Sequence, residues 1–574
     1  MYILVAFLII GFAANVIPPP MSRLQTTRGV GCGSAPAAQV PTHWTVQLAP
    51  GLDPRNVSFD GFTYVGPVGF LPDMYVYRAS ATQRRSVFPR SGKPEVVFAE
   101  QQVHRMRFRR IADPFYQNQW HLWRGFASVE ADHEPTGYNG SGITIAIVDD
   151  GLQHTHPDLK GNYDARNSWD FNGNDPDPTP ESSQDGHGTA AAGVAAAIRE
   201  NGHCGRGVAP SARLVGLRGI AEPIDDTTEG QMLSYNAIGV VDIFSCSWGP
   251  YDDGITMDAP GYVLQSALAT YAGQMRGRLG KGTIYIWAAG NGRANGDSCA
   301  FDGYAGSPFV MAIGATTHTG GQAWYSESCS ALMAVTPSSG DRQGITTVDL
   351  MGAAGYDPSE CTASFGGTSS AAPLAAGIVA LVLQARPDFT WRDVKHVVAK
   401  GAVQIKSEDP DWHVNARGYK HSHKYGFGLL KVPAIMMAVR THQLVPNRDK
   451  RFTSGLIPLI GRPYLIPCVA NYTVRNSGIT FIEHVVITIS INHEARGHVS
   501  INMTSPEGTV SQLATVRPKD QTAHYPAGGW KFTSVRHWGE SRADGMWIVT
   551  TGDEYPRTTG RGHLNGMTLE IWGY

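Results

Sequence analysis

The sequence predicts an α/β fold, a parallel sheet with helices on both faces, followed by a separate all-β sandwich. Two patterns carry this prediction. From about residue 142 to 385, continuous apolar runs alternate with Ala- and Gly-rich helical stretches, as in a buried parallel sheet covered by helices. After about residue 437, segments such as HVVITISINH alternate apolar and polar residues at period two, and SPEGT marks a turn.

The chain begins with an apolar stretch from Tyr2 to Ala14, followed by prolines at positions 18 to 20. This stretch is too short to cross a bilayer and is typical of a signal peptide, expected over residues 1–20. We therefore expect a secretory-pathway protein, secreted or lumenal. No second apolar run of about 18 residues follows, so we expect no transmembrane anchor. Glycosylation sequons agree with this route and begin at Asn56, Asn139, Asn471 and Asn502.

Length and charge narrow the class of protein. The 574 residues are enough for three to four structural units. Lys and Arg number 47 and Asp and Glu 49, giving a net charge of −2. This balance argues against a nucleic-acid partner.

Three short segments supply a carboxylate, an imidazole and a hydroxyl in the order Asp, His, Ser. Asp149 ends the apolar run ITIAIVDD, so we expect it at the end of a buried strand. His187 and Ser369 each open an Ala-rich helical stretch, and Pro373 is expected in the first turn of the second helix. A serine hydroxyl needs a neighbouring base, the role expected of His187, with Asp149 holding the imidazole.

Asn291 lies in WAAGNG after another apolar run. An amide side chain there can donate a hydrogen bond to the oxyanion formed in acyl transfer. Alone, an Asn between glycines is more often a turn residue. Together with the other three residues it predicts a serine hydrolase, and the order Asp, His, Ser is that of the subtilisin plan.

Other segments indicate which family of subtilisin-like proteases the chain resembles. They are SWGPYDDGITMD from Ser247, CAFDGY from Cys299, and GTSSAAPLAAG around the serine. With them the chain resembles the kexin/furin proprotein convertases from about residue 40 to its end. The resemblance implies a calcium-dependent serine endopeptidase that cleaves proproteins after paired or multiple basic residues (Arg-x-Arg/Lys-Arg). It implies a small α+β propeptide at 21–110, a subtilisin-like catalytic domain at 111–437 and a sandwich, the P domain, at 438–574.

The resemblance also implies an acidic substrate cleft. Asp252 and Asp302 would bind the arginine before the scissile bond, and Asp150 the second basic residue. Asp258 and Glu229 would meet an arginine at the fourth position. The chain departs from the family just before His187, where Gln184 stands at a usual aspartate and Asp185 follows it. We therefore expect the contact with the second basic residue to be weakened, or displaced to Asp185.

The segment RMRFRR ends in an Arg-x-Arg-Arg site at Arg110. A basic linker is the alternative, but no other run in the chain is as basic. We expect the enzyme to cut itself after Arg110 and its propeptide to remain as an inhibitor. The pair ending at Arg85 is the expected second cleavage site.

Calcium is the expected cofactor. Hard oxygen donors on the loop DFNGNDPDP suit this ion, through Asp170, Asp175 and Asp177. Without the family match, a solvated acidic turn is equally good. The resemblance implies a second site, formed by Asp113, Asp158 and Asn201, and a third, formed by Asp252, Asp297 and Glu327.

The chain has seven cysteines, so at least one is unpaired. The resemblance pairs Cys204 with Cys361 and Cys299 with Cys329. It leaves Cys32, Cys246 and Cys468 without an assigned role.

Two other functions compete with a convertase. One is a degradative subtilisin of broader specificity, and the other is a catalytically silent secreted protein whose sandwich binds partners. The acidic cleft argues against the first and the complete triad against the second. For a convertase the partners would be proproteins with basic cleavage sites and its own propeptide, and we expect a monomer.

Overall fold

The computed structural model describes residues 43–80, 93–102, 113–123, 125–131, 137–352, 355–447, 449–457, 464–555 and 562–574. The chain forms two compact units, Met1–Arg109 and Arg110–Tyr574. The predicted signal peptide and both predicted cleavage sites, Arg85 and Arg110, lie outside the described residues.

The first unit contains a four-stranded antiparallel sheet in the order β2-β3-β1-β4. Its residues alternate between buried and less buried along β1, so that Val46 and Leu48 enter a small core beside Tyr77. The described part of this unit carries strands only. Their bounds are β1 His43–Leu48, β2 Phe62–Pro67, β3 Met74–Ala79 and β4 Val96–Gln101.

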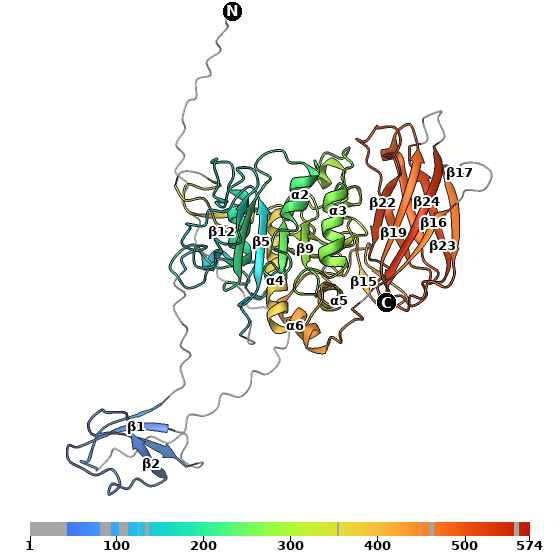
Figure 1. The fold of residues 1–574 in the computed structure, drawn as a ribbon. Coiled ribbons are helices and arrows are strands. Elements are labelled where there is room, and N and C mark those ends of the chain that lie inside the picture. The colour runs from blue at the N-terminus through green and yellow to red at the C-terminus, as the bar shows by residue number, and fades with distance from the viewer. Residues whose placement is uncertain are drawn as a thin grey trace, which may run out of the picture. The chain divides into compact units, whose positions relative to one another are not determined.

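The second unit is built around a seven-stranded parallel sheet in the order β11-β10-β9-β8-β5-β7-β6 (Figure 1). The central strand β5 is buried along its whole length, as its continuous apolar run predicts. The bounds are β5 Thr144–Asp149, β6 Trp169–Asp170, β7 Arg213–Arg218, β8 Ile243–Cys246, β9 Ile284–Ala288, β10 Val310–Thr316 and β11 Leu332–Pro337. Short ribbons are formed by β12 Ile345–Val348 with β13 Cys361–Phe365, and by β14 His413–Val414 with β15 Lys420–His421.

Helices cover both faces of this sheet, as predicted. Tyr285 of β9 points to the face of α2 and donates to the carbonyl of Leu233, at 2.7 Å. Thr336 of β11 points to the opposite face and donates to Ala371 of α4, at 2.9 Å. The bounds are α1 His187–Ala196, α2 Asp226–Met232, α3 Tyr262–Leu268, α4 Thr368–Ala385, α5 Trp391–Gly401 and α6 Val432–Thr441.

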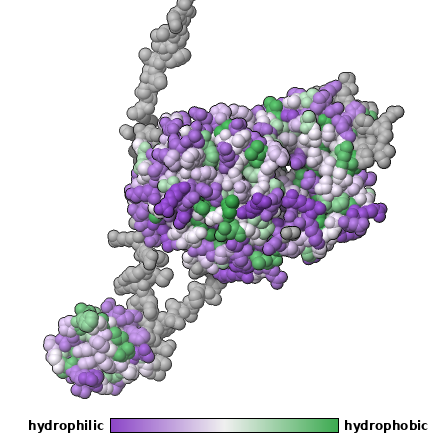
Figure 2. Space-filling model, in the orientation of Figure 1, coloured by the Kyte–Doolittle hydropathy of each residue, from purple (hydrophilic) through white to green (hydrophobic). Residues whose placement is uncertain are grey.

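The helix α4 is, among the described helices, the one long and apolar enough to cross a bilayer, but 89% of it is buried inside the fold. It is therefore a core helix. On the face shown in Figure 2, apolar side chains of this unit are scattered in small groups among polar ones.

The C-terminal part is a β-sandwich, as predicted. One sheet has the order β16-β24-β19-β22, with β17 beside β24, and the other has the order β18-β23-β20-β21. The inward residues Val485, Ile487, Ile489 and Ile491 of β19 are all buried. The bounds are β16 Lys450–Ile457, β17 Tyr464–Leu465, β18 Cys468–Val474, β19 Ile482–Asn492, β20 Val499–Thr504, β21 Val510–Ala514, β22 Trp530–Ser534, β23 Gly545–Asp553 and β24 His563–Gly573.

The sandwich and the catalytic part share one core cluster. In it Phe301 packs edge-on against Phe532, with ring centroids 5.7 Å apart. Trp530 donates to the carbonyl of Ala300 at 2.8 Å. The two parts are therefore packed as one body rather than joined only by a linker.

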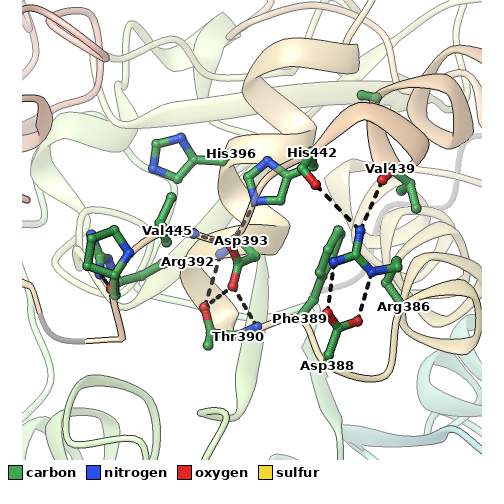
Figure 3. Close-up of polar contacts among 12 residues, drawn as sticks. Arg386, Asp388, Phe389, Thr390, Arg392, Asp393, His396, Val439, His442 and Val445 are labelled. Atoms are coloured by element: carbon green, nitrogen blue, oxygen red, sulfur yellow. Dashed lines mark hydrogen bonds and ion pairs between the residues drawn. The ribbon is translucent and has the colours of Figure 1, made fainter.

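The segment between α6 and β16 is held by the N-terminus of α5 (Figure 3). Thr390 and Asp393 form a capping box, which satisfies the first backbone amides of this helix. The same Asp393 carboxylate accepts hydrogen bonds from His442 Nε2 at 2.7 Å and from the backbone of Val445 at 2.8 Å. One carboxylate thus caps a helix and fixes the chain on its way to the sandwich.

Candidate active site

Asp149 and His187 are brought together by the ends of a strand and a helix. Asp149 is the last residue of β5 and is 1% exposed, while His187 is the first residue of α1. Their side chains are joined by a hydrogen bond of 2.8 Å between Nδ1 of His187 and Oδ1 of Asp149. Among the described residues, Nε2 of the imidazole has no hydrogen-bond partner.

Ser369 is the second residue of α4 and is 9% exposed. Phe365, four residues earlier, packs edge-on against the His187 ring with centroids 5.4 Å apart. The helices α1 and α4 also pack against each other. Within the described residues the Ser369 hydroxyl makes no hydrogen bond, and it lies at a helix N-terminus where backbone amides favour negative charge.

The position of Pro373 differs from the prediction. Because α4 begins at Thr368, this proline lies in its second turn, inside the helix. It cannot donate to the carbonyl four residues earlier, which is that of Ser369. Ser247 donates to this carbonyl instead, at 3.1 Å.

Asn291 lies beside the start of α4. Its Oδ1 accepts hydrogen bonds from the backbone amide of Thr368 at 2.8 Å and from the Thr368 hydroxyl at 3.1 Å. With Oδ1 occupied, Nδ2 is the group free to donate. A Cβ added to Gly367 would lie 3.5 Å from Asn291 Nδ2 and 3.6 Å from the Ser369 backbone nitrogen, so these two donors flank the same short turn.

The carboxylates control the charge of the imidazole. Burial disfavours the imidazolium, but Asp149 and then Asp150 favour it, and the net effect raises the pKa of His187 to about 9. Burial, with repulsion from Asp149, raises the pKa of Asp150 to about 7. The two acids and the base thus form one electrostatic unit.

Asp150 has a structural role that sequence reasoning missed. Its oxygens accept from the backbone amides of His187 at 3.1 Å and Gly188 at 2.7 Å, while the N-cap residue Gly186 offers no side chain. Asp150 therefore caps α1 from outside the helix. The doublet of aspartates ending β5 was the only available signal in the sequence.

Asp185 has an ion-pair partner within the protein. Its carboxylate is buried and accepts from Arg218 Nη2 at 3.4 Å, while Gln184 is exposed. Arg218 comes from β7, and this partner could not be inferred from the local sequence. Arg218 also pairs with Asp170 at 2.8 Å and with Glu181 at 3.5 Å, so its one positive charge is shared among three carboxylates.

Asp252 and Asp302 lie close enough to interact. Asp252 Oδ2 accepts from the backbone amide of Asn291 at 2.8 Å. Asp302 Oδ1 accepts from the amide of Tyr304 at 2.7 Å. Burial, together with the charge of Asp252, raises the pKa of Asp302 to about 7, so a cation placed here would be stabilised by both carboxylates.

Glu229 and Asp258 form a second acidic group. Both oxygens of Glu229 accept from the Tyr304 hydroxyl, at 2.9 and 3.1 Å. Burial raises the pKa of Glu229 to about 6, and Asp258 adds to this rise. Asp258 itself is exposed, and its backbone forms a β-bridge with Asp302, which links the two acidic groups.

The predicted calcium residues differ in how well they suit the ion. In the described residues, no three His, Cys, Asp or Glu side chains converge with ligand geometry. Asp158 is fully buried, and its Oδ1 has no hydrogen-bond partner within the described part of the chain. The carboxylate of the neighbouring Asp113 accepts from the amide of Asn201 at 2.8 Å. An oxygen left without a donor beside a second carboxylate fits a hard cation.

The third predicted calcium site also fits. Asp297, Glu327 and the carbonyl of Asp252 crowd around Gly292. A Cβ added to this glycine would lie within 3.0 Å of an atom of each. Burial and the neighbouring Asp297 raise the pKa of Glu327 well above its ordinary value. A cation would relieve this repulsion.

The loop DFNGNDPDP brings two of its three carboxylates together. Asp170 is fully buried and pairs with Arg218 at 2.8 Å. Asp177 pairs with His154 at 3.1 Å, and Asp175 approaches Asp170 across Gly173. The structure therefore brings Asp170 and Asp175 together, and Arg218 already binds Asp170, the buried member of this pair.

The disulfides Cys204–Cys361 and Cys299–Cys329 are both present, as the resemblance implied. Cys246 is buried, which raises its pKa well above that of a free thiol, and Cys468 is partly exposed. Cys32 lies outside the described residues.

Comparisons with known proteins agree with this geometry. Residues 140–428 match the subtilase family, and residues 482–572 match the proprotein convertase P-domain. Mouse furin is 35% identical over 562 residues, which is 92% of this chain and 68% of furin. The chain belongs to the proprotein convertase branch of the subtilases. It is thus a member of a serine peptidase family.

Other convertases and a solved structure extend this comparison. Rat proprotein convertase subtilisin/kexin type 6 is 35% identical over 572 residues, covering 92% of this chain and 59% of the rat protein. The chain therefore spans about three fifths of that relative. A serine protease of Aeromonas sobria shares the fold, with a TM-score of 0.72 and 22% identity over 82% of this chain and 96% of that protein.

Proposed function

We propose that this convertase is a calcium-dependent serine endopeptidase of the secretory pathway that cuts proproteins after paired or multiple basic residues (Arg-x-Arg/Lys-Arg). One observation carries the proposal: Asp252 accepts a hydrogen bond from the backbone of Asn291. The Asp252 carboxylate, which suits a guanidinium, is thereby hydrogen-bonded to the residue expected to donate to the oxyanion. Asp302 lies near enough to share the charge, and paired carboxylates favour arginine through bidentate hydrogen bonds.

In the proposed mechanism, Ser369 attacks the carbonyl carbon of the scissile bond while His187, in its neutral imidazole form, takes the hydroxyl proton. Asp149 holds the imidazole by its Nδ1 and stabilises the imidazolium. The amide of Ser369 and Nδ2 of Asn291 donate to the oxyanion. His187 then gives its proton to the leaving amine, and water releases the acyl group by the reverse sequence.

Calcium would be held by Asp113, Asp158 and Asn201, and by Asp252, Asp297 and Glu327. The ion would offset the negative charge of clustered carboxylates beside the arginine site. The orphan oxygen of Asp158 and the crowding around Gly292 support these two sets.

The proposed architecture follows the family: signal peptide 1–20, propeptide 21–110, catalytic domain 111–437 and P domain 438–574. The propeptide would be cut after Arg110, remain as an inhibitor, and be released by a second cut after Arg85. We propose that the active enzyme is a monomer.

The test compares the wild-type chain with Ser369→Ala. The wild type should separate its propeptide at Arg110, and the variant should not. The purified wild type should cleave an Arg-x-Arg-Arg peptide, lose activity with a chelator, and ignore a version with Leu before the scissile bond. Equal cleavage of both peptides would indicate a degradative subtilisin, and no processing at all would indicate a silent binding protein.

A further inference from the structure

The sandwich inserts a buried arginine into the catalytic part. Arg517, in the segment between β21 and β22, is 0% exposed, which is rare for an arginine unless every charge is matched. Its guanidinium pairs with Asp520, also fully buried, and lies 3.9 Å above the ring centroid of Phe301. Burying a charged guanidinium is unfavourable, so the residues that Arg517 contacts indicate what it does for the protein.

The contacts of Arg517 converge on one loop. Its Nη1 donates to the carbonyl of Thr256 at 2.8 Å, and its Nη2 to that of Ile255 at 3.2 Å. A second sandwich arginine, Arg496, donates to the same Ile255 carbonyl at 2.8 Å and pairs with Asp520 at 2.8 Å. We call Arg496, Arg517 and Asp520 the arginine clamp.

The loop held by the clamp spans residues 252–258, between the two carboxylates Asp252 and Asp258. It has no strand or helix of its own. Gly254 has a φ of +77° and donates to Asp297 Oδ2 at 2.8 Å, while Asp297 Oδ1 accepts from Arg517 at 3.3 Å. Apart from the bridge of Asp258 to Asp302 and the turn closed by Asp253, the loop has no regular backbone pairing, so the clamp supplies part of the order that its carboxylates need.

A second path reaches the same loop. Lys519 of the sandwich donates to Asn295 Oδ1 at 2.6 Å, and Asn295 Nδ2 donates to the carbonyl of Asp252 at 2.7 Å. Both side chains are exposed, so this path can be cut without opening the core.

We propose that Arg517 is a positioning residue for substrate recognition: from the sandwich it fixes the loop that carries Asp252 and Asp258, so that the P domain forms part of the arginine-binding site. This inference rests on the proposed function, because it assigns arginine recognition to those carboxylates. Arg517 touches no substrate itself. It acts through the Ile255 and Thr256 carbonyls and through Asp297.

A matched pair of variants tests the role. Arg517→Lys keeps the charge but loses the planar, two-nitrogen reach of the guanidinium. Arg392→Lys makes the same change at another buried contact between the two parts, where Arg392 of α5 binds Glu483 of β19 at 2.7 Å and touches no residue of the loop. If Arg517 only docks the sandwich, the two variants should behave alike.

The expected result separates them. Arg517→Lys should raise KM for an Arg-x-Arg-Arg peptide about tenfold with kcat within about threefold, the effect of losing one charge-assisted hydrogen bond. Arg392→Lys should lower the melting temperature without moving KM. Equal KM shifts in both variants, or a lowered melting temperature alone in Arg517→Lys, would overturn the proposal.

Two further measurements keep the outcome decisive. If Arg517→Lys does not fold, Lys519→Ala and Asp520→Asn replace it, and an unchanged KM in both would overturn the proposal. A fluorophosphonate probe, which carries no basic group, labels Ser369 if the hydrolytic site is functional. Wild-type protein that takes the label but shows no preference for arginine would refute the proposed function itself, separately from the clamp.

Discussion

Asn291 is hydrogen-bonded both to the start of the helix that carries Ser369 and to the carboxylate of Asp252. Its Oδ1 is held by Thr368 and its backbone amide by Asp252, so its Nδ2 is oriented without any substrate present. Asn291→Leu should lower kcat by about 10²–10³-fold and leave KM nearly unchanged, because the lost donor acts only in the transition state. Steady-state kinetics on an Arg-x-Arg-Arg peptide check this. A rise in KM with normal kcat would instead assign Asn291 to ground-state binding.

The charge of His187 depends on Asp149. Its folded-state pKa of about 9 exceeds the ordinary value of 6.5. The pair therefore stabilises the fold fully below about pH 6.5, and this contribution is lost as pH rises through about 9. Asp149→Asn should lower the pKa of His187, because it removes the strongest favourable charge while burial continues to disfavour the imidazolium.

Histidine ring titration by NMR in the Ser369→Ala background measures this shift. Asp177→Asn is the control, because Asp177 pairs with His154 and should not affect His187. A His187 that titrates near 6.5 with Asp149 intact would contradict the prediction.

Single residues also show where prediction from sequence stops. The triad and Asn291 could be proposed because each lies at the end of an apolar run or the start of a helix, a pattern readable within about ten residues. The fate of Asp185 could not, because its partner Arg218 is 33 positions away. Likewise Arg517 reaches Asp297 across 220 positions, and nothing near VRPKD indicates a buried guanidinium.

At the scale of elements, α4 tolerates an internal proline because another segment's side chain satisfies the open carbonyl. Ser247→Ala should destabilise the fold by about 1–3 kcal/mol, the cost of a buried carbonyl without a donor. Adding Pro373→Ala should recover much of this loss, because the alanine would have a backbone amide that can donate to the Ser369 carbonyl.

A double-mutant cycle of urea unfolding in the Ser369→Ala background measures the coupling. Additive effects of the two substitutions would show that Ser247 and Pro373 are independent.

Elements are predictable where one periodicity persists. The fully buried β5 and the alternating β19 both match their sequence patterns. The sequence predicts that α4 starts at Ser369 with Pro373 in its first turn, whereas the helix starts at Thr368 and Pro373 lies in the second turn. Gly367 offers no side-chain cap, and the boundary depends on the contact between Thr368 and Asn291. Boundaries set by distant side chains are not encoded locally.

At the scale of the second unit, the catalytic part and the sandwich should unfold together. They share a core through Phe301 and Phe532, and Ser330 donates to the carbonyl of Thr533 at 2.7 Å. Calorimetry of the Ser369→Ala protein should show one transition for both parts, because exposing either face costs the other its packing. Phe532→Ala should lower that single transition by several degrees, whereas two separated transitions would refute the shared core.

The Asp393 carboxylate has a consequence for engineering. It caps α5 and also binds His442 and Val445, so the segment joining the two parts is not an interchangeable tether. A chimera that takes its sandwich from a relative and splits the chain at residue 437 would separate this carboxylate from its partners. Grafts that carry α5 through β16 as one cassette should keep the junction intact, which makes this whole segment, and not the linker alone, the practical unit of exchange.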